Sequence, residues 1–442
     1  MAGPIGARSA LALAGIGLAW AGLLHCPVAY AQFVPNYFPA GVPGFEQELG
    51  VTVVQRVRPL YEEPGVRLGS FVIHSALDET VGYNSNVFGY AGAPGSAMIS
   101  TAPSLSINSD WSRNALGASI SADDYRYPGA ASQNTTIWNA AVGGAYTIGR
   151  SNLDVAYSHA SLSESATDIG APPSATPIPY TIDEFRTGTT IDLGRIQISP
   201  NFDYSLYRYG SAAVIGQPSN QGFRNSDIAR GGAAFRYVLS DQRSLLVVVQ
   251  AIDSDFVNPL PNTPSLSSTS ELVMGGLDYQ YNGLWRYQLL AGMEVRSFAA
   301  SGFATRTAPI AKATAIWTPT GLTTVTGTVL RTLDDPVEEG TSGFTYSSAE
   351  LRVDHEYRRN ILLNAEIGAR LVNYLQSNAS ETQPYVSVGA TWLMNEHMHL
   401  TGQYTFTNQS TSGAVVNTST NTPLFSSNYN QNLVLLTLHL AL

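Results

Sequence analysis

Along most of the chain, apolar and polar side chains alternate at every second position, in segments of roughly 12 to 16 residues. In segment 196–209, for example, Ile198 and Phe202 fall on one face of an extended chain, and Asn201 and Asp203 fall on the other. The same alternation recurs in segments 96–111, 284–298 and 428–442. A period of two is typical of β-strands that have one apolar and one polar face. The pattern therefore predicts an all-β protein.

The connections between these segments alternate strictly between short and long. The short connections lie near Ser112-Arg113, Gly149-Arg150, Gly194-Arg195, Asp241-Gln242, Asn282-Gly283, Pro319-Thr320, Arg359-Asn360 and Asn395-Glu396. The long connections cover approximately 84–96, 128–133, 165–181, 210–225, 257–267, 299–304, 335–343, 376–381 and 410–427. Outer-membrane barrels have short periplasmic turns and longer external loops. The sequence predicts a transmembrane antiparallel up-and-down β-barrel of about 18 strands, with about 16 as the alternative, and with both termini periplasmic.

The first 31 residues have the features of a cleaved signal peptide. Arg8 precedes an apolar run that is too short to span a bilayer comfortably, and small residues at Ala29 and Ala31 fit a signal peptidase site. We therefore expect residues 1–31 to be removed, so that the mature chain begins at Gln32. Cleavage also removes Cys26, the only cysteine, and the exported protein then has no disulfides.

Composition excludes several classes of protein. Of the 442 residues, 44% are hydrophobic and 13% are charged, which fits neither a disordered chain nor a coiled coil. The 23 basic residues, of which only Lys312 is a lysine, are outnumbered by 33 acidic residues. Without a Lys-rich face to neutralise phosphates, we expect no nucleic-acid partner.

Residues 32–64 lie between the predicted signal peptide and the predicted barrel, which we place at residues 65–442. Phe33, Tyr37 and Phe38 in this segment are interspersed with prolines. Two interpretations stay open: a plug or periplasmic docking segment, or an unattached leader. The proline-rich loop from Ala166 to Thr181 is similarly ambiguous, because it could fold into the lumen or stay outside.

The polar faces of the predicted strands carry charges of both signs, and these should line the lumen. With about 18 strands the lumen is too wide to be filled by side chains alone, so it holds either a channel or a plug. The candidate lumen or constriction residues are Arg286, Glu294, Arg296, Glu350, Arg352, Asp354, Glu356, Glu366 and Arg370. Those from 350 to 370 lie on two successive strands and are expected to form one cross-strand charged patch. The patch could orient solutes in a transverse field, or its charges could merely neutralise one another.

Two features near the strand ends agree with a membrane barrel. Trp111, Trp285, Trp317 and Trp392 all fall near predicted periplasmic strand ends, where aromatic girdles meet the lipid headgroups. The chain ends inside its last predicted strand, at Leu442. That ending resembles the signal that the outer-membrane assembly machinery reads, although the usual pattern ends in an aromatic residue.

The region that starts the predicted barrel carries a family resemblance. The runs Arg58-Pro59-Leu60-Tyr61, Gly65-Val66-Arg67-Leu68-Gly69-Ser70-Phe71 and Tyr83-Asn84-Ser85-Asn86-Val87-Phe88 resemble the start of the putative β-barrel porin 2 family. The resemblance implies an outer-membrane barrel of a Gram-negative bacterium, and some similar barrels are associated with exopolysaccharide loci. From the residues themselves, Gly65 to Phe71 is expected to begin the first strand.

No catalytic or cofactor motif stands out. His159-Ala160-Ser161 superficially resembles a lipid-hydrolase arrangement, and His397 and His399 share a strand face, but neither set has the further residues that a site needs. We expect no enzymatic activity, no cofactor and no metal site.

The predicted function is therefore a channel that spans the lipid of the outer membrane and lets hydrophilic solutes pass. Two alternatives stay open: exopolysaccharide export with periplasmic partners, in which lumenal aromatics such as Tyr125 and Tyr207 could stack on sugars, and a plugged barrel without transport. The oligomeric state cannot be inferred from the sequence.

Overall fold

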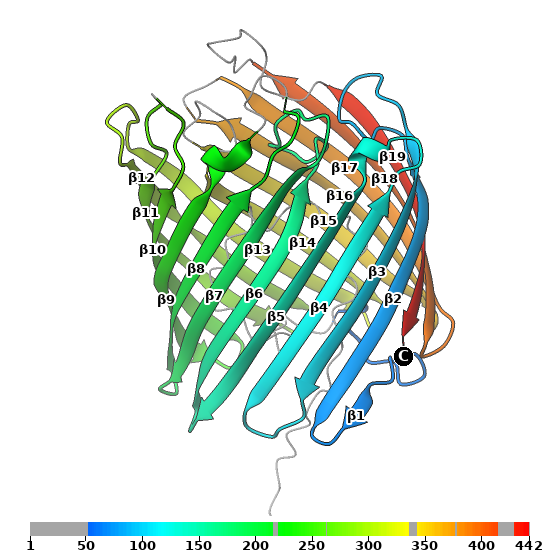
Figure 1. Cartoon of the computed structure of the whole chain (residues 1–442). Helices are drawn as coiled ribbons and strands as arrows, with labels where there is room; N and C mark the ends of the chain where they lie inside the picture. The colour runs from blue at the N-terminus through cyan, green and yellow to red at the C-terminus, as the bar shows by residue number, and fades with distance from the viewer. Residues whose placement is uncertain are drawn as a thin grey trace, which may run out of the picture.

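A closed ring of 18 antiparallel strands forms the wall of the protein in the computed structural model (Figure 1). The structure describes residues 52–214, 220–261, 263–335, 343–375, 378–413 and 428–441. The wall strands are β2 (Phe71–Asn84), β3 (Ser96–Ser109), β4 (Ala115–Arg126), β5 (Thr135–Ile148), β6 (Ser151–Glu164), β7 (Ile178–Asp192), β8 (Ile196–Tyr209), β9 (Ser226–Ser240), β10 (Arg243–Phe256), β11 (Ser268–Tyr281), β12 (Trp285–Phe298), β13 (Arg306–Thr320), β14 (Thr323–Asp334), β15 (Phe344–Arg358), β16 (Ile361–Tyr374), β17 (Ser380–Leu393), β18 (Met398–Ser412) and β19 (Tyr429–Ala441). The all-β prediction and the strand number of 18 are confirmed. The predicted signal peptide and Leu442 lie outside the described residues.

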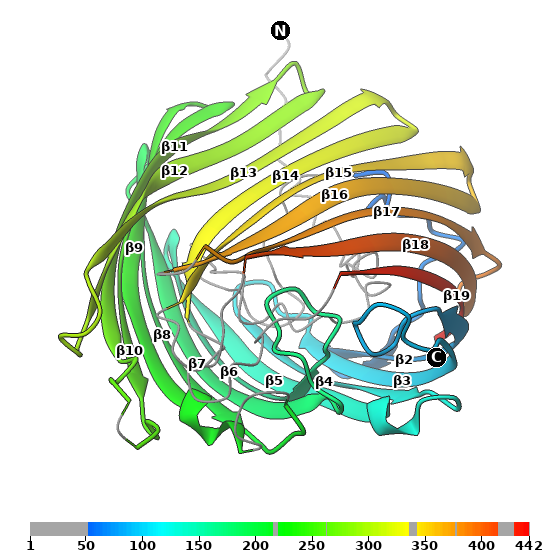
Figure 2. The same cartoon turned by 90° about the horizontal axis from the view of Figure 1, so that it is seen from above.

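The ring closes where the first and last wall strands pair. β19 runs antiparallel to β2, with a register from Leu433 opposite Asn84 to Ala441 opposite Ala76. Figure 2, which looks down the barrel, shows these two strands side by side. Because closure leaves no unpaired strand edge, the backbone groups of the wall are satisfied without water.

The stretch from Gly65 to Phe71 leads into the first wall strand only at its last residue, so the expectation that it begins that strand as one continuous segment is corrected. Val66–Leu68 instead forms the short strand β1, which pairs back onto the start of β2. The chain turns between them at Gly69, whose φ of 62° lies in the left-handed region that glycine tolerates without strain. The first wall strand begins only at Phe71.

Short and long connections fall at opposite ends of the barrel, as the sequence predicts, and we call these the short-turn end and the long-loop end. The turn at Asn282-Gly283 has φ values of 51° and 65°, the left-handed conformations that tight hairpins require. One predicted turn is displaced, because Pro319-Thr320 still belongs to β13 and the chain reverses at 321–322. A register shift between Trp317 and Thr320 accounts for the extra length of the strand.

The two faces of the wall differ as the alternation predicts. On β12, Leu289 and Met293 point outward and are 40% and 46% exposed, while Leu290 and Glu294 face the lumen and are 2% and 3% exposed. Trp392, one of the tryptophans expected near the periplasmic strand ends, is exposed at the short-turn end. Within the described residues, no helix is long and apolar enough to cross a bilayer.

Candidate functional site: the lumen and its two narrowed ends

Residues 52–64, which we call the mouth segment, lie at the short-turn end along the inner side of the wall, from β14 to β19. The backbone N–H of Val53 donates to Thr324 Oγ1 of β14 at 2.9 Å, and both residues are fully buried. Arg58 Nη2 donates to Glu356 Oε2 of β15 at 2.9 Å, in an ion pair whose side chains are about nine-tenths buried. The described part of the predicted N-terminal segment is therefore attached to the barrel wall.

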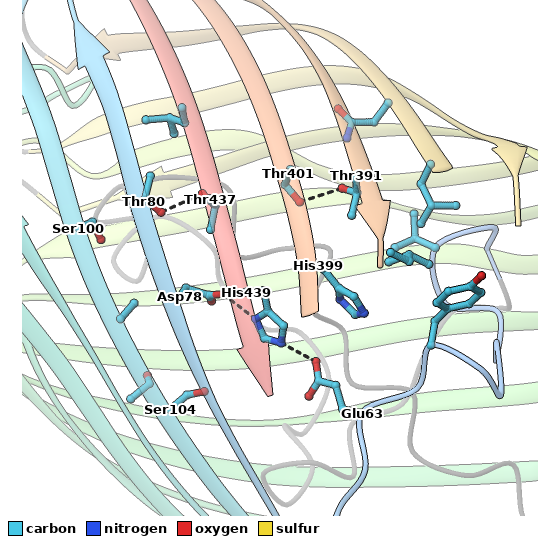
Figure 3. A pocket seen from close by; sticks show the side chains of 18 of the residues that line it. Glu63, Asp78, Thr80, Ser100, Ser104, Thr391, His399, Thr401, Thr437 and His439 are labelled. Atoms are coloured by element: carbon cyan, nitrogen blue, oxygen red, sulfur yellow. Dashed lines mark hydrogen bonds and ion pairs between the residues drawn. The ribbon is translucent and has the colours of Figure 1, made fainter. Parts of the chain in front are cut away.

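A second attachment lies farther round the wall, on β19. Glu63 Oε1 of the mouth segment lies 2.8 Å from His439 Nε2 of β19, close to the seam between β19 and β2. Between the two attachments lies a cavity of about 290 Å³. Figure 3 views this cavity, with Glu63 pointing from the mouth segment toward the strands. Its polar lining includes Arg56, Glu62, His74, Asp123, Arg352 and Asp354.

On the wall beside this cavity, an arginine joins two acidic residues of neighbouring strands. Arg352 of β15 makes ion pairs with Asp354 Oδ1 at 2.9 Å and with Glu366 Oε2 of β16 at 3.5 Å. Arg352 and Glu366 are directly opposite one another in the strand register. Tyr385 of β17 donates to the other oxygen of Glu366 at 2.6 Å. The structure thus brings together the centre of the charged group that the sequence singles out on these two strands.

The outer members of that group have separate partners. Glu356 lies toward the short-turn end and binds the mouth segment, as described above, with Arg56 Nη1 3.5 Å from its Oε2. Arg370 lies toward the long-loop end, where it donates to Gln383 Oε1 at 2.9 Å. Glu350 accepts a hydrogen bond from Thr328 Oγ1 at 3.4 Å. The group therefore extends along the wall of the lumen.

The three candidate residues on β12 lie apart from this group and at two levels of the barrel. Arg296 is buried near the long-loop end and contacts Glu294 Oε1 at 3.2 Å and Asp335 Oδ1 at 2.9 Å. Arg286 lies near the short-turn end, 3.6 Å from Asp278 Oδ2. Arg296 also donates to two backbone carbonyls at the end of β14, so it fastens the loop that follows that strand.

At the long-loop end, the connection between β6 and β7 (residues 165–177) crosses the lumen, and we call it the inward loop (Figure 2). The backbone N–H of Gly170 donates to the buried carboxylate of Glu381 on β17 at 3.0 Å. Tyr429 of β19 donates to the carbonyl of Thr167 at 3.0 Å. Ile169 packs into a buried apolar cluster whose other members are Phe344, Tyr346, Val372, Tyr374 and Ala379. Of the two interpretations left open for this loop, the structure supports the one in which it folds inward.

The next long loop supports the base of the inward loop. It contains a 3-10 helix, η4 (Gln221–Arg224), from which Arg224 makes two hydrogen bonds to Glu164 at 2.8 and 3.2 Å. Burial acts to lower the pKa of Arg224, but the Glu164 carboxylate acts in the opposite direction and the pKa is raised overall. Arg224 therefore stays charged, and both partners of the pair are almost fully buried.

The other side chains that the sequence analysis considered lie in different surroundings. Tyr207 is packed in a buried cluster with Ile178 and Tyr180, and Tyr125 is 8% exposed, so neither offers a free ring face to a sugar. His159 lies 2.7 Å from Asp183 Oδ1. Of the two histidines His397 and His399, only His399 lines the cavity, where it lies beside His439.

A family model described as "Putative beta-barrel porin 2" matches residues 58–436. The chain belongs to this family. The resemblance inferred from the sequence is therefore confirmed, and the protein is an outer-membrane barrel of porin-like type. The part matched by the family model includes Arg58, Glu63 and Glu356, but it ends before His439.

Solved structures of transport proteins resemble this member of the porin family only distantly. The FrpB iron transporter from Neisseria meningitidis (F5-1 variant) is 7% identical, with 86% of this chain and 83% of that chain covered and a TM-score of 0.45. OpdK from Pseudomonas aeruginosa, solved with vanillate, is 12% identical, with 84% and 99% covered and a TM-score of 0.48. OccAB3 from Acinetobacter baumannii is 9% identical, with 85% and 100% covered and a TM-score of 0.46. No curated protein matches the chain.

Sequence reasoning missed the residues that narrow the two ends of this porin-family barrel. Arg58 was noted only as part of the family resemblance, and Glu381 was not singled out. The one available signal was position: Arg58 and Glu63 are charged residues in a short stretch beside the first strand. Their partners on distant strands could not be read from that stretch.

Proposed function

We propose that this protein is an outer-membrane channel for small hydrophilic solutes, with its short-turn end in the periplasm and the mouth segment within its periplasmic opening. The observation that carries the proposal is the charged network around Arg352, which lines the inner wall beside a cavity that other charged side chains also line. Ion pairs and hydroxyls along a lumen replace part of the hydration shell of a polar solute, whereas they would repel an apolar one.

The charges of the network are largely paired, which favours a channel of broad specificity over one for a single ion. Arg352 faces two carboxylates, and Arg58 faces Glu356. A field of alternating sign suits neutral polar molecules such as sugars, which carry donors and acceptors but no net charge.

Single-channel recording in a planar bilayer tests this proposal. The mature protein is compared with a version that lacks residues 32–64, which removes both attachments of the mouth segment. We expect a steady current in the full-length protein and a several-fold larger one after the deletion. Liposome swelling with sugars of increasing size then measures the size limit of the pathway.

Two other outcomes would point to the alternatives. Current only after the deletion would favour a plugged barrel, opened by an export partner such as exopolysaccharide machinery. No current from either form, with both shown to be folded by their heat-dependent mobility on gels, would exclude a channel and leave a structural role.

A further inference from the structure

Three side chains that can bind a metal meet at the attachment of the mouth segment to the seam. Glu63 comes from the mouth segment, His399 from the start of β18 and His439 from the end of β19. One ligand atom from each lies within 4.8 Å of the other two. The two histidines are directly opposite one another in the register of β18 and β19, and their rings stack at 5.5 Å (Figure 3).

A fourth residue holds one of the histidines in the orientation that a metal ligand needs. Asp78 of β2 is the register partner of His439, and its Oδ1 lies 2.5 Å from His439 Nδ1. With Nδ1 engaged by a carboxylate, Nε2 of the ring points toward Glu63. Histidines that bind metals commonly have this arrangement, in which a carboxylate fixes the ring and makes it a stronger ligand.

The other histidine has a buried nitrogen without a well-aligned hydrogen bond. Nε2 of His399 is buried and has no partner of good hydrogen-bond geometry in the described part of the chain, although the backbone of Tyr61 and of Asn395 lies close to the ring. Burial of a polar atom without a well-placed partner is unfavourable, so native proteins rarely retain one without a reason. A bond to a metal would satisfy this atom.

We propose that Glu63, His399 and His439 bind one divalent ion of the zinc class. Two imidazole nitrogens and one carboxylate oxygen are a ligand set that zinc uses, with a fourth position left for water, whereas magnesium and calcium prefer oxygen ligands alone. The open position would face the cavity that these three residues help to line. The ion would fasten the mouth segment to β18 and β19.

The geometry requires only a small adjustment. Ligands at about 2.0–2.1 Å from a tetrahedral zinc ion lie roughly 3.3 Å from one another. Glu63 Oε1 and His439 Nε2 lie 2.8 Å apart, so they would separate slightly as the ion replaces their hydrogen bond. His399 would approach them by a turn of its side chain.

The ion would regulate the channel proposed above, so this inference rests on that proposed function. Metal binding is measured without recording a current, and it can therefore fail independently of conduction.

Calorimetric titration of the purified full-length protein with zinc chloride tests the site. After treatment with a chelator, we expect one zinc ion per chain and no binding of magnesium. Loss of an outer carboxylate partner weakens metal binding by about 10–100-fold. Asp78→Asn should therefore weaken zinc binding by about that factor, and His399→Ala or His439→Ala should weaken it more.

His397→Ala is the matched control, because His397 lies in the adjoining turn and should leave zinc affinity unchanged. Cobalt(II) absorption of the wild-type protein gives a check that needs no variant, since a tetrahedral site with two histidines gives intense visible bands. The proposal is overturned if the wild type binds no zinc, if the two histidine variants bind as tightly as the wild type, or if cobalt shows only the spectrum of the hydrated ion.

A spin label on the mouth segment tests whether the ion fastens it. Leu60 is 77% exposed, so Leu60→Cys can carry the label without disturbing packing, and in the mature protein, which begins at Gln32, no other cysteine competes for it. Zinc should slow the motion of the label in this protein and leave it unchanged when His399→Ala is added. An equal response with and without His399 would overturn the role assigned to the ion.

Discussion

The two ends of the lumen are narrowed by segments that are attached in different ways. The inward loop is fixed in the wall at both of its ends, by β6 and β7, and it inserts Ile169 into a buried apolar cluster. The mouth segment leads into the wall only at its C-terminal end, through β1, and is otherwise attached through polar contacts such as Arg58 with Glu356.

This difference predicts different mechanical behaviour. Apolar burial in a closed cluster is insensitive to salt, and a loop anchored at both ends cannot leave without unfolding the barrel rim. Polar contacts depend more on salt where a partner is exposed, as in the pair of Arg56 with Glu356, and they exchange more readily with water than apolar contacts do. We expect the long-loop end to be a fixed constriction and the short-turn end to be an adjustable one.

The largest effect should come from the cluster that holds the inward loop. Phe344 is completely buried there, against Ile169 and Tyr374. Phe344→Ala should lower the free energy of unfolding by about 3–5 kcal/mol, because it removes a large buried side chain and leaves a cavity. Urea unfolding in lipid vesicles measures the change.

Leu351→Ala is the control for this substitution, since Leu351 lies on the same strand but is 47% exposed on the outer face. A loss of stability as large as that of Phe344→Ala would contradict the special role of the cluster.

A smaller effect is expected from the polar contact of the inward loop. Glu381 accepts hydrogen bonds from Gly170 at 3.0 Å, Tyr374 at 3.1 Å and Gln409 at 2.8 Å. Glu381→Ala leaves these donors without their partner and should cost about 1–3 kcal/mol. Hydrogen exchange at Gly170 should become faster, whereas the exposed turn variant Glu396→Ala should leave that rate unchanged. Unchanged protection at Gly170 in Glu381→Ala would show that the bond does not restrain the loop.

The sequence alone predicts contacts between neighbouring strands better than contacts between distant segments. Arg352 and Glu366 could be placed in one patch in advance, because a short turn at Arg359-Asn360 joins their strands. Their direct pairing also depends on a register shift between Glu356 and Arg358, which the sequence does not predict. The wall itself follows from local alternation, which each strand carries within its own residues. Both predictions depend only on neighbours in the chain.

Contacts between distant segments were beyond such reasoning. Val53 binds Thr324 across a separation of 271 residues, and nothing in either local pattern specifies the other. His399 and His439 lie on successive strands, but the long connection between β18 and β19 leaves their register free. The narrowing of the lumen at both ends therefore required the three-dimensional structure.

At the short-turn end, loss of one ion pair should loosen the mouth segment without removing it. Glu356→Gln removes the charge that Arg58 and Arg56 share, while Val53 and Glu63 still hold the segment. Conductance should rise, but by less than after deletion of residues 32–64. In the wild type, raising salt should also increase conductance somewhat beyond the simple increase in ion concentration. Screening weakens the pair of Glu356 with Arg56, whose side chain is 39% exposed, more than the buried pair with Arg58. Equal scaling of both proteins with salt would contradict an electrostatic attachment.

The smallest effect is expected from the paired charges of the wall, where no segment moves. Arg352→Gln leaves Asp354 and Glu366 without their shared cation, so the lumen gains negative charge near the cavity. The permeability ratio of potassium to chloride, obtained from reversal potentials in a salt gradient, should increase modestly while the size limit for sugars stays the same. Arg195→Gln in the exposed turn between β7 and β8 should leave the ratio unchanged. An unchanged ratio in Arg352→Gln would mean that ions pass through the barrel along a path away from this wall.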